Sequence, residues 1–260
     1  MLHGLRVEDG LRVLVTAGAA GIGRAIVEAM LEAGAKVHLC DVDETALAEC
    51  RRALPQVGAS HADVADEDAV DAMFADVRAT LGGLDVLVNN AGIAGPTGNV
   101  EDIDPADWRR CLDVDLTGMF LCTRRAVPLL KAAGGGAIVN MSSAAGRLGY
   151  AYRTPYAAAK WGVIGFTQSL ARELGPHRIR VNAVLPGIVA GPRIDRVIEA
   201  RAAQTGMSFA EMEQTYLANT SMRTKVTPHD VAGAVVYLCS PLGARVSGQS
   251  LGVCGNVETI

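Results

Sequence analysis

Residues 12–23 read RVLVTAGAAGIG, and the architecture of this 260-residue chain follows from them. The nearly apolar run Arg12–Thr16 predicts a strand that is covered on both faces, as strands are in parallel sheets. A glycine loop, residues 16–23, comes next, and a helical pattern begins at Ile22. Glycine lets the backbone turn sharply and approach a pyrophosphate, while a helix N-terminus offers free N–H groups and a positive dipole. Strand, glycine loop and helix in this order predict a dinucleotide-binding unit.

The same alternation of strand and helix runs along the rest of the chain. Short apolar runs predict further strands at Lys36–Asp41, Asp85–Asn89, Ala137–Met141, Arg180–Leu185 and near Gln249–Cys254. Helical patterns lie at Ile22–Ala33, Glu44–Ala53, Glu67–Leu81, Pro105–Lys131, Thr154–Leu174 and Pro228–Ser240. This alternation predicts an α/β fold, a Rossmann-type doubly wound parallel sheet with helices on both faces.

The length allows one large domain or two small ones. No linker-like or low-complexity stretch divides the chain, so we expect a single domain over residues 1–260. Segment 187–227 interrupts the rhythm with short helical pieces at Arg193–Ala203 and Ser208–Ala218. It follows a strand end, where an open α/β sheet has its ligand crevice, which predicts a lid or substrate loop. A decorative surface insertion is the alternative.

Composition excludes several classes of protein. Lys and Arg number 24 against 28 Asp and Glu, and a net charge of −4 leaves no electrostatic footprint for nucleic acid. The longest nearly apolar run, Val231–Cys239, is far shorter than the roughly 20 residues of a membrane span. Glu8 and Asp9 lie where a signal peptide needs apolar residues, so we expect a cytoplasmic protein.

Cysteine and histidine spacing argues against metal. The six cysteines contain no CxxC pair, which predicts buried reduced thiols rather than a disulfide framework or a zinc site. The five histidines, His3 among them, fall at chain ends, strands and turns without ligand spacing, and we expect no metal site.

Asp41 ends the second predicted strand. A carboxylate at this position suits the hydroxyls of an adenine ribose and repels a 2′-phosphate. Val42 rather than Arg follows it, and the glycine loop holds no Arg, so the sequence favours NAD over NADP. A solvated Asp41 after an ordinary turn is the alternative.

Tyr156 and Lys160 are four residues apart in a predicted helix, so their side chains share one face. An ammonium beside a phenol stabilises the phenolate, which can exchange a proton with an alcohol or carbonyl oxygen near neutral pH. Ser143 follows the predicted strand Ala137–Met141, where its hydroxyl can hold the same oxygen. The Tyr–Lys spacing alone is common in proteins, so it indicates a catalytic site only in combination with Ser143 and the glycine loop.

Together these segments resemble the short-chain dehydrogenase/reductase family over nearly the whole chain. The matching segments, in family order, are the glycine loop 16–23, Asp63-Val64, Asn89-Asn90-Ala91-Gly92, Ser143, Tyr156 with Lys160, and Pro186-Gly187. The resemblance implies one Rossmann-type domain, usually a homotetramer, that transfers hydride between a nicotinamide and an alcohol or ketone. It also implies that Tyr156 is the acid/base, that Lys160 binds the nicotinamide ribose, and that Ser143 positions the substrate oxygen.

The resemblance further implies a set of cofactor contacts. Asp63 and Val64 are expected at the adenine, Asn90 on the adenosine ribose side, and the backbone of Ile188 and Val189 at the carboxamide. The complete expected set is Gly18, Gly21, Ile22, Gly23, Asp41, Asp63, Val64, Asn90, Tyr156, Lys160, Ile188 and Val189.

The chain departs from the family pattern at two positions. Ala17 fills the first glycine place and Gly18 follows it, so we expect the turn to shift by one residue. Asp115 stands where the family commonly has an Asn that holds a water beside the Lys as the fourth catalytic member. If the backbone carbonyl binds that water, Asp115 can substitute. If the side chain matters, its carboxylate changes the charge beside Lys160.

The substrate is expected to be a small secondary alcohol or its ketone, with a sugar, polyol or hydroxy acid favoured. Arg153 and Arg193 are candidates to face an anionic or polyhydroxylated substrate, since the Arg fork suits carboxylate and phosphate. Solvated surface arginines are the alternative. Two rival functions stay open: an NAD(H)-binding regulator without turnover, and another chemistry on this fold such as an epimerase or dehydratase.

Overall fold

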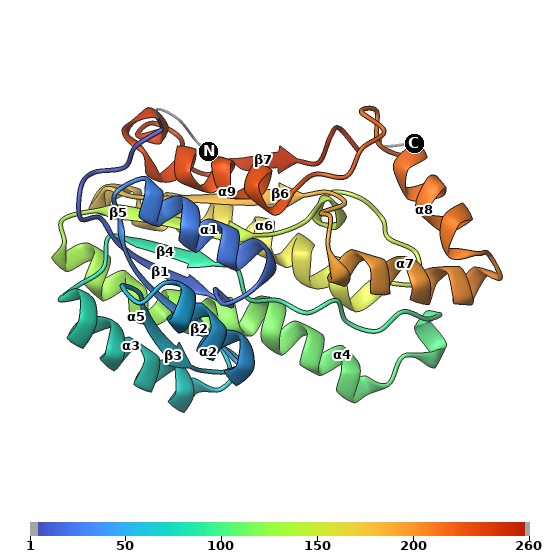
Figure 1. Cartoon of the computed structure of the whole chain (residues 1–260), viewed down its shortest axis with the longest axis horizontal. Coiled ribbons are helices and arrows are strands. Elements are labelled where there is room, and N and C mark those ends of the chain that lie inside the picture. The colour runs from blue at the N-terminus through green and yellow to red at the C-terminus, as the bar shows by residue number, and fades with distance from the viewer. Residues whose placement is uncertain (1–4, 258–260) are drawn as a thin grey trace.

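The computed structural model describes residues 5–257 as one seven-stranded parallel sheet between two helical layers (Figure 1). The strands are β1 (Arg12–Thr16), β2 (Lys36–Asp41), β3 (Gly58–His61), β4 (Val86–Asn89), β5 (Gly136–Met141), β6 (Ile179–Pro186) and β7 (Ser250–Val253). They lie in the order β3-β2-β1-β4-β5-β6-β7. The predicted α/β class and doubly wound parallel sheet are therefore confirmed.

Helices cover both faces because each central strand is apolar on both. One face packs against α1 (Gly21–Glu32), α2 (Glu44–Ala53) and α9 (Pro228–Cys239). The other packs against α3 (Glu67–Leu81), α5 (Gly118–Ala132) and α6 (Thr154–Leu174). In β1, Val13 and Val15 belong to the first core and Leu14 to the second, as the alternation of side chains along a strand requires.

The strand order reverses between β1 and β4, and this positions the site. The chain builds β2 and β3 on one side of β1, and then places β4 on the other side. In open α/β sheets ligands bind outside the carboxyl ends of the strands at such a reversal. The glycine loop follows β1, Asn90 follows β4, and Ser143 follows β5, so all three segments lie at this edge.

Two elements differ from the sequence expectation. Strand β3 was not predicted, because GASH offers no β-branched residue and only Ser60 is buried at this sheet edge. The helix expected over 105–131 consists of α4 (Pro105–Leu112), one wide π-helical turn at Asp113–Thr117, and α5. A π-helical turn frequently marks a functional site, and this one carries Asp115.

Segment 187–227 forms a small helical unit beyond one end of the sheet (Figure 1). It contains α7 (Pro192–Thr205) and α8 (Phe209–Ala218), which share a core of Ile198, Met212 and Tyr216. Val189 and Val226 pair in a short parallel bridge, so the segment begins and ends at one place. None of the helices in residues 5–257 is long and apolar enough to cross a membrane.

Candidate active site

The glycine loop turns through Ala17 and Gly21, whose φ angles are +49° and +54°. A Cβ on Gly21 would meet no atom within 4 Å, so this glycine faces open space. A Cβ on Gly23 would overlap the carbonyl oxygen of Ala17, which is why the loop packs this tightly against α1. Gly18 faces away from the loop opening, because its Cβ would lie 2.7 Å from the Cβ of Leu39. The expected one-residue shift does not occur, since Ala17 itself adopts the left-handed conformation.

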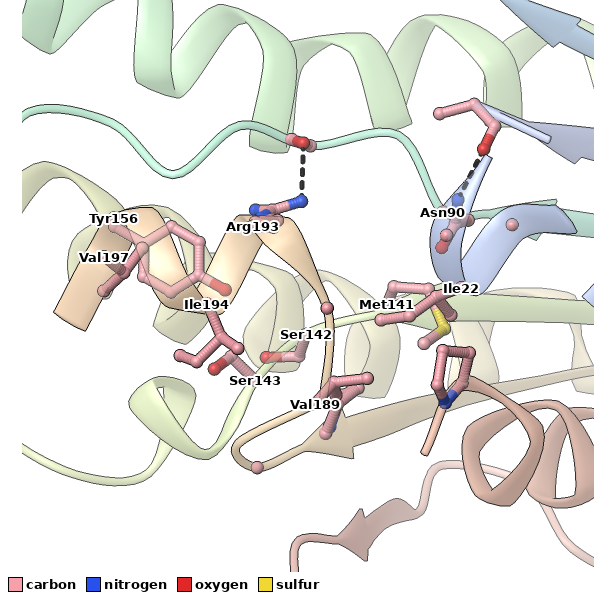
Figure 2. A pocket seen from close by; sticks show the side chains of 18 of the residues that line it. Ile22, Asn90, Met141, Ser142, Ser143, Tyr156, Val189, Arg193, Ile194 and Val197 are labelled. Atoms are coloured by element: carbon pink, nitrogen blue, oxygen red, sulfur yellow. Dashed lines mark hydrogen bonds between the residues drawn. The ribbon is translucent and has the colours of Figure 1, made fainter. Parts of the chain in front are cut away.

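A cavity of about 340 Å³ opens in front of this loop. Its walls come from the glycine loop, the carboxyl ends of the central strands, α6 and the start of α7 (Figure 2). The expected residues that line it are Gly21, Ile22, Gly23, Asp41, Asn90, Ser143, Arg153, Tyr156, Lys160, Val189 and Arg193. An elongated dinucleotide fits these groups, because the open face of Gly21 admits a pyrophosphate at the start of α1.

Asp41 is fixed at the carboxyl end of β2 by backbone donors. Its Oδ2 accepts from the Ala19 N–H at 3.1 Å, and its Oδ1 accepts from Val42 and Asp43 at 2.8 and 3.2 Å. The carboxylate therefore joins β2 to the glycine loop while it lines the cavity.

Asn90 ties the end of β4 to the glycine loop. Its Nδ2 donates to the carbonyl oxygens of Thr16 and Ala17, each at 3.0 Å. The Thr16 hydroxyl accepts in return from the backbone N–H groups of Asn90 and Ala91 at 2.9 Å. These four bonds hold the two sides of the strand-order reversal together.

Lys160 lies between Tyr156 and Asp115. Its Nζ is 5.6 Å from the centroid of the Tyr156 ring, 3.2 Å from Asp115 Oδ2, and donates to the Met141 carbonyl at 3.1 Å. Asp115 Oδ1 accepts from the Ile93 N–H at 2.6 Å. The carboxylate is fully buried beneath the ammonium and does not reach the cavity. This arrangement fixes the ammonium beside the phenol.

Ser143 leaves its hydroxyl hydrogen free for a ligand. Its oxygen accepts from the Ala145 N–H at 3.2 Å and so caps a short 3₁₀ turn after β5. Neighbouring Ser142 is turned inward and donates to the Lys160 carbonyl at 2.8 Å. Ser143 therefore offers a donor on the cavity wall that Tyr156 also lines (Figure 2).

The two candidate substrate arginines differ in burial. Arg193, at the start of α7, is exposed and donates from Nη1 to the Gly92 carbonyl at 2.9 Å, so it bridges the cavity (Figure 2). Arg153 is 3% exposed, donates from Nη2 to the Ala94 carbonyl at 2.6 Å, and packs over the Tyr156 ring at 4.7 Å from its centroid.

The structure does not bring four of the expected cofactor residues to the cavity wall: Gly18, Asp63, Val64 and Ile188. Asp63 pairs with Arg110 at 2.8 Å, and Val64 is buried. The expected contacts of these four residues stay predictions. Ile194 and Val197 also line the cavity, from α7, and they were not predicted from the sequence (Figure 2). Their three-residue spacing on one helix face was the available signal.

Across residues 5–257, no group of three His, Cys, Asp or Glu side chains is placed to hold a metal ion. His3 lies outside the described residues. His38 is buried and contacts the hydroxyl groups of Ser60 and Thr80 through its two ring nitrogens, at 2.8 and 2.9 Å.

A glycine loop at the strand-order reversal, with Ser, Tyr and Lys on the same cavity, defines a Rossmann-type oxidoreductase. Residues 17–256 match the family model described as enoyl-(acyl carrier protein) reductase. The chain belongs to the short-chain dehydrogenase/reductase family, and it is an oxidoreductase that acts on CH–OH groups.

Relatives and solved structures agree with this family. The cis-4-hydroxycyclohexanecarboxylate dehydrogenase of Sinomonas cyclohexanicum is 39% identical over 95% of this chain and 96% of its own. NAD⁺-bound xylitol dehydrogenase superposes with a TM-score of 0.92 at 27% identity, covering 95% of this chain and 99% of its own. An actinorhodin polyketide ketoreductase variant with NADPH superposes with a TM-score of 0.89 at 34% identity. The match covers 96% of this chain and 98% of the ketoreductase. The family thus includes neighbours with either nicotinamide cofactor.

Proposed function

We propose that the protein is an NAD-dependent dehydrogenase that interconverts a small secondary alcohol and its ketone. The observation that carries the proposal is the convergence of Ser143, Tyr156 and Lys160 on the cavity in front of the glycine loop. Names of similar proteins support a polar substrate, since they include a xylitol dehydrogenase and a hydroxycyclohexanecarboxylate dehydrogenase.

A nicotinamide bound in the cavity supplies the acceptor or donor of hydride. Tyr156 takes the alcohol proton as phenolate, or returns it to the ketone oxygen as phenol. Ser143 donates its free hydroxyl hydrogen to the same oxygen and holds it within reach of Tyr156. Lys160 stabilises the phenolate, and Asp115 with Met141 holds the ammonium at that position.

The preference for NAD over NADP is supported by Asp41. Its carboxylate lines the cavity and is held in place by three backbone donors. The basic residues on the cavity wall lie far from the β2 edge in the chain: Arg153 directly precedes α6, Lys160 is in α6 and Arg193 is in α7. A 2′-phosphate beside Asp41 would therefore meet a like charge without compensation.

We propose that segment 187–227 is the lid of this site. Its first residues line the cavity, and Arg193 reaches from α7 to the Gly92 carbonyl after β4. The paired backbones of Val189 and Val226 give the segment a common base about which it can move. Closure of such a segment excludes water from the reacting groups.

We further propose a cytoplasmic homotetramer. Five cysteines are buried as free thiols, which supports a reducing compartment. Phe120 on α5 and Trp161 on α6 are large apolar side chains with about half their surface exposed, and they support an interface between copies. Light scattering after size exclusion measures the assembly, and cell fractionation measures the location.

The test of the function is turnover of secondary alcohols with NAD, followed as NADH absorbance. The wild type should oxidise at least one member of a panel of sugars, polyols and hydroxy acids. Tyr156→Phe should abolish this turnover while the protein still binds NADH, as measured by calorimetry. Turnover by Tyr156→Phe at the wild-type kcat would refute the proton role, and an active wild type excludes a regulator that only binds NAD(H).

A further inference from the structure

Arg153 carries a buried charge without a partner anion. Its side chain is 3% exposed, and Nη2 alone is bonded, to the Ala94 carbonyl. Nε is buried and has no hydrogen-bond partner. The ion pairs within residues 5–257 do not include Arg153. Burial of a charge is costly unless it is paired, so this guanidinium calls for an anion.

The guanidinium lies at the reacting end of the cavity. Arg153 lines the same cavity as Ser143 and Tyr156, and its central carbon is 4.7 Å from the centroid of the Tyr156 ring. Tyr150 offers a second ring face at 5.7 Å. Ring faces attract a cation but accept no strong hydrogen bond from Nε. The two tyrosines therefore position the charge without satisfying its donors.

The charges on the cavity wall are unbalanced at this end. Asp41 is the one acidic residue among the described residues that line the cavity, and it lies at the β2 edge. The ammonium of Lys160 is already paired with the Asp115 carboxylate, at 3.2 Å. Arg193 bonds a backbone carbonyl, which carries no charge. Arg153 and Arg193 thus leave a positive field around the place of the substrate.

We propose that the substrate is a hydroxy carboxylic acid whose carboxylate binds Arg153. This rests on the proposed function and names the substrate class of the same site. The Arg fork donates to both oxygens of a carboxylate, and such charge-assisted bonds are short and directional. The guanidinium contacts the Tyr156 ring, so the acid group stands a few carbon atoms from the carbinol.

The reaction then balances without a further reagent. The hydrogen of the carbinol C–H bond passes to NAD⁺ with the bonding electron pair, as hydride. The O–H proton passes to Tyr156, the C=O bond forms, and the carboxylate is unchanged. The products are the oxo acid, NADH and one proton. Binding of the carboxylate fixes the carbinol against Ser143 and Tyr156, which is how a remote contact contributes to rate.

A purely positioning role for Arg153 is the rival explanation. A guanidinium that only holds the Tyr156 ring would affect acidic and neutral substrates alike. The two roles are separated by the ratio of kcat/KM for an acid to that for its methyl ester. The probes are 4-hydroxycyclohexanecarboxylate and 3-hydroxybutanoate, each compared with its methyl ester, with NAD in excess.

The wild type should prefer at least one acid over its ester by about 30-fold or more, since loss of one partner of a desolvated charge pair costs that much. Arg153→Gln should bring this ratio to about one, and Arg153→Lys should keep part of it. Arg201→Gln is the matched control, because Arg201 packs on the Tyr150 ring from α7 at 5.5 Å. It should keep the wild-type ratio.

Equal kcat/KM for acid and ester in the wild type overturns the proposal, while the dehydrogenase function stands. An unchanged ratio in Arg153→Gln overturns it as well, even if both rates fall. Absence of NAD turnover with every alcohol instead refutes the proposed function. Calorimetry then still tests the anion site: NADH-bound wild type should bind cyclohexanecarboxylate but not cyclohexanecarboxamide, and Arg153→Gln should bind neither. Equal affinity for acid and amide overturns the proposal.

Discussion

The carboxylate of Asp115 and the ammonium of Lys160 lie 3.2 Å apart, with their side chains 0% and 4% exposed. The π-helical turn at 113–117 carries the first and α6 the second. A buried ion pair depends on both partners, since either charge alone is left uncompensated. The side chain of Asp115 therefore holds the Lys160 ammonium in its position beside Tyr156.

Asp115→Ala should destabilise the protein by about 3 kcal/mol, because it leaves a buried ammonium and removes the acceptor of the Ile93 N–H. Asp115→Asn should reduce the stability by less, since the amide oxygen of Asn can still accept from the Ile93 N–H. Urea unfolding of the cofactor-free protein measures both values. In the Asp115→Ala/Lys160→Met double variant, the loss should be smaller than the sum of the two single losses. Additive losses would contradict the coupling.

Asp41→Asn should narrow the preference between cofactors. The substitution keeps an acceptor oxygen for the Ala19 N–H but removes the charge that opposes a 2′-phosphate. We expect the kcat/KM of wild type to be about 100-fold higher with NAD than with NADP, since like charges in contact cost several kcal/mol. In the variant this ratio should be much smaller. Asp43→Asn is the control, because Asp43 caps α2 through the Ala46 N–H. Equal kcat/KM for NAD and NADP in wild type would refute the role of Asp41.

The parts of the fold that sequence predicted are those with strong local signals. The apolar run of β1 and the glycine loop identified the βαβ unit, because burial on both faces and close backbone approach each demand particular residues. Strand β3 escaped prediction because Gly58–His61 gains its structure from pairing with β2 rather than from its own composition. Likewise, a π-helical turn has no composition signal that separates it from an ordinary helix.

The candidate site divides in the same way. Tyr156, Lys160 and Ser143 follow from spacing on a helix and from a strand end, so sequence places them on the cavity. The burial of Arg153 cannot be predicted from the sequence, because it depends on the Ala94 carbonyl and on two tyrosine rings that the fold brings to it. Whether an arginine is solvated or unpaired is a property of tertiary packing alone.

His38 should make stability depend on pH between about 4 and 6.5. Burial lowers the pKa of His38 to about 4 from 6.5. The unfolded chain therefore binds a proton below pH 6.5 that the folded protein does not accept until about pH 4. The contribution of His38 to the free energy of unfolding is therefore fully present above pH 6.5. It falls by up to about 3 kcal/mol toward pH 4, at 1.36 kcal/mol for each pKa unit.

The measurement is urea unfolding at several values between pH 4.5 and 7, the range set by the shifted pKa. His38→Gln should flatten the pH dependence relative to wild type. His61→Gln is the control, since His61 is exposed on the neighbouring strand. A pH slope in His38→Gln equal to that of wild type would show that other groups cause the dependence.

Ala17→Gly should stabilise the protein slightly. Ala17 has a φ of +49°, and the left-handed conformation costs an L-residue about 1–2 kcal/mol. Glycine removes this strain, but the greater conformational entropy of the unfolded chain offsets about 0.4–1 kcal/mol of it, so the net gain lies between about 0 and 1.6 kcal/mol. For a chain of this size, Tm should rise by about 2 °C. Ala19→Gly is the matched control, because Ala19 has no positive φ and should lose stability. Calorimetric scans in which both variants melt below wild type would contradict the expected stabilisation by Ala17→Gly.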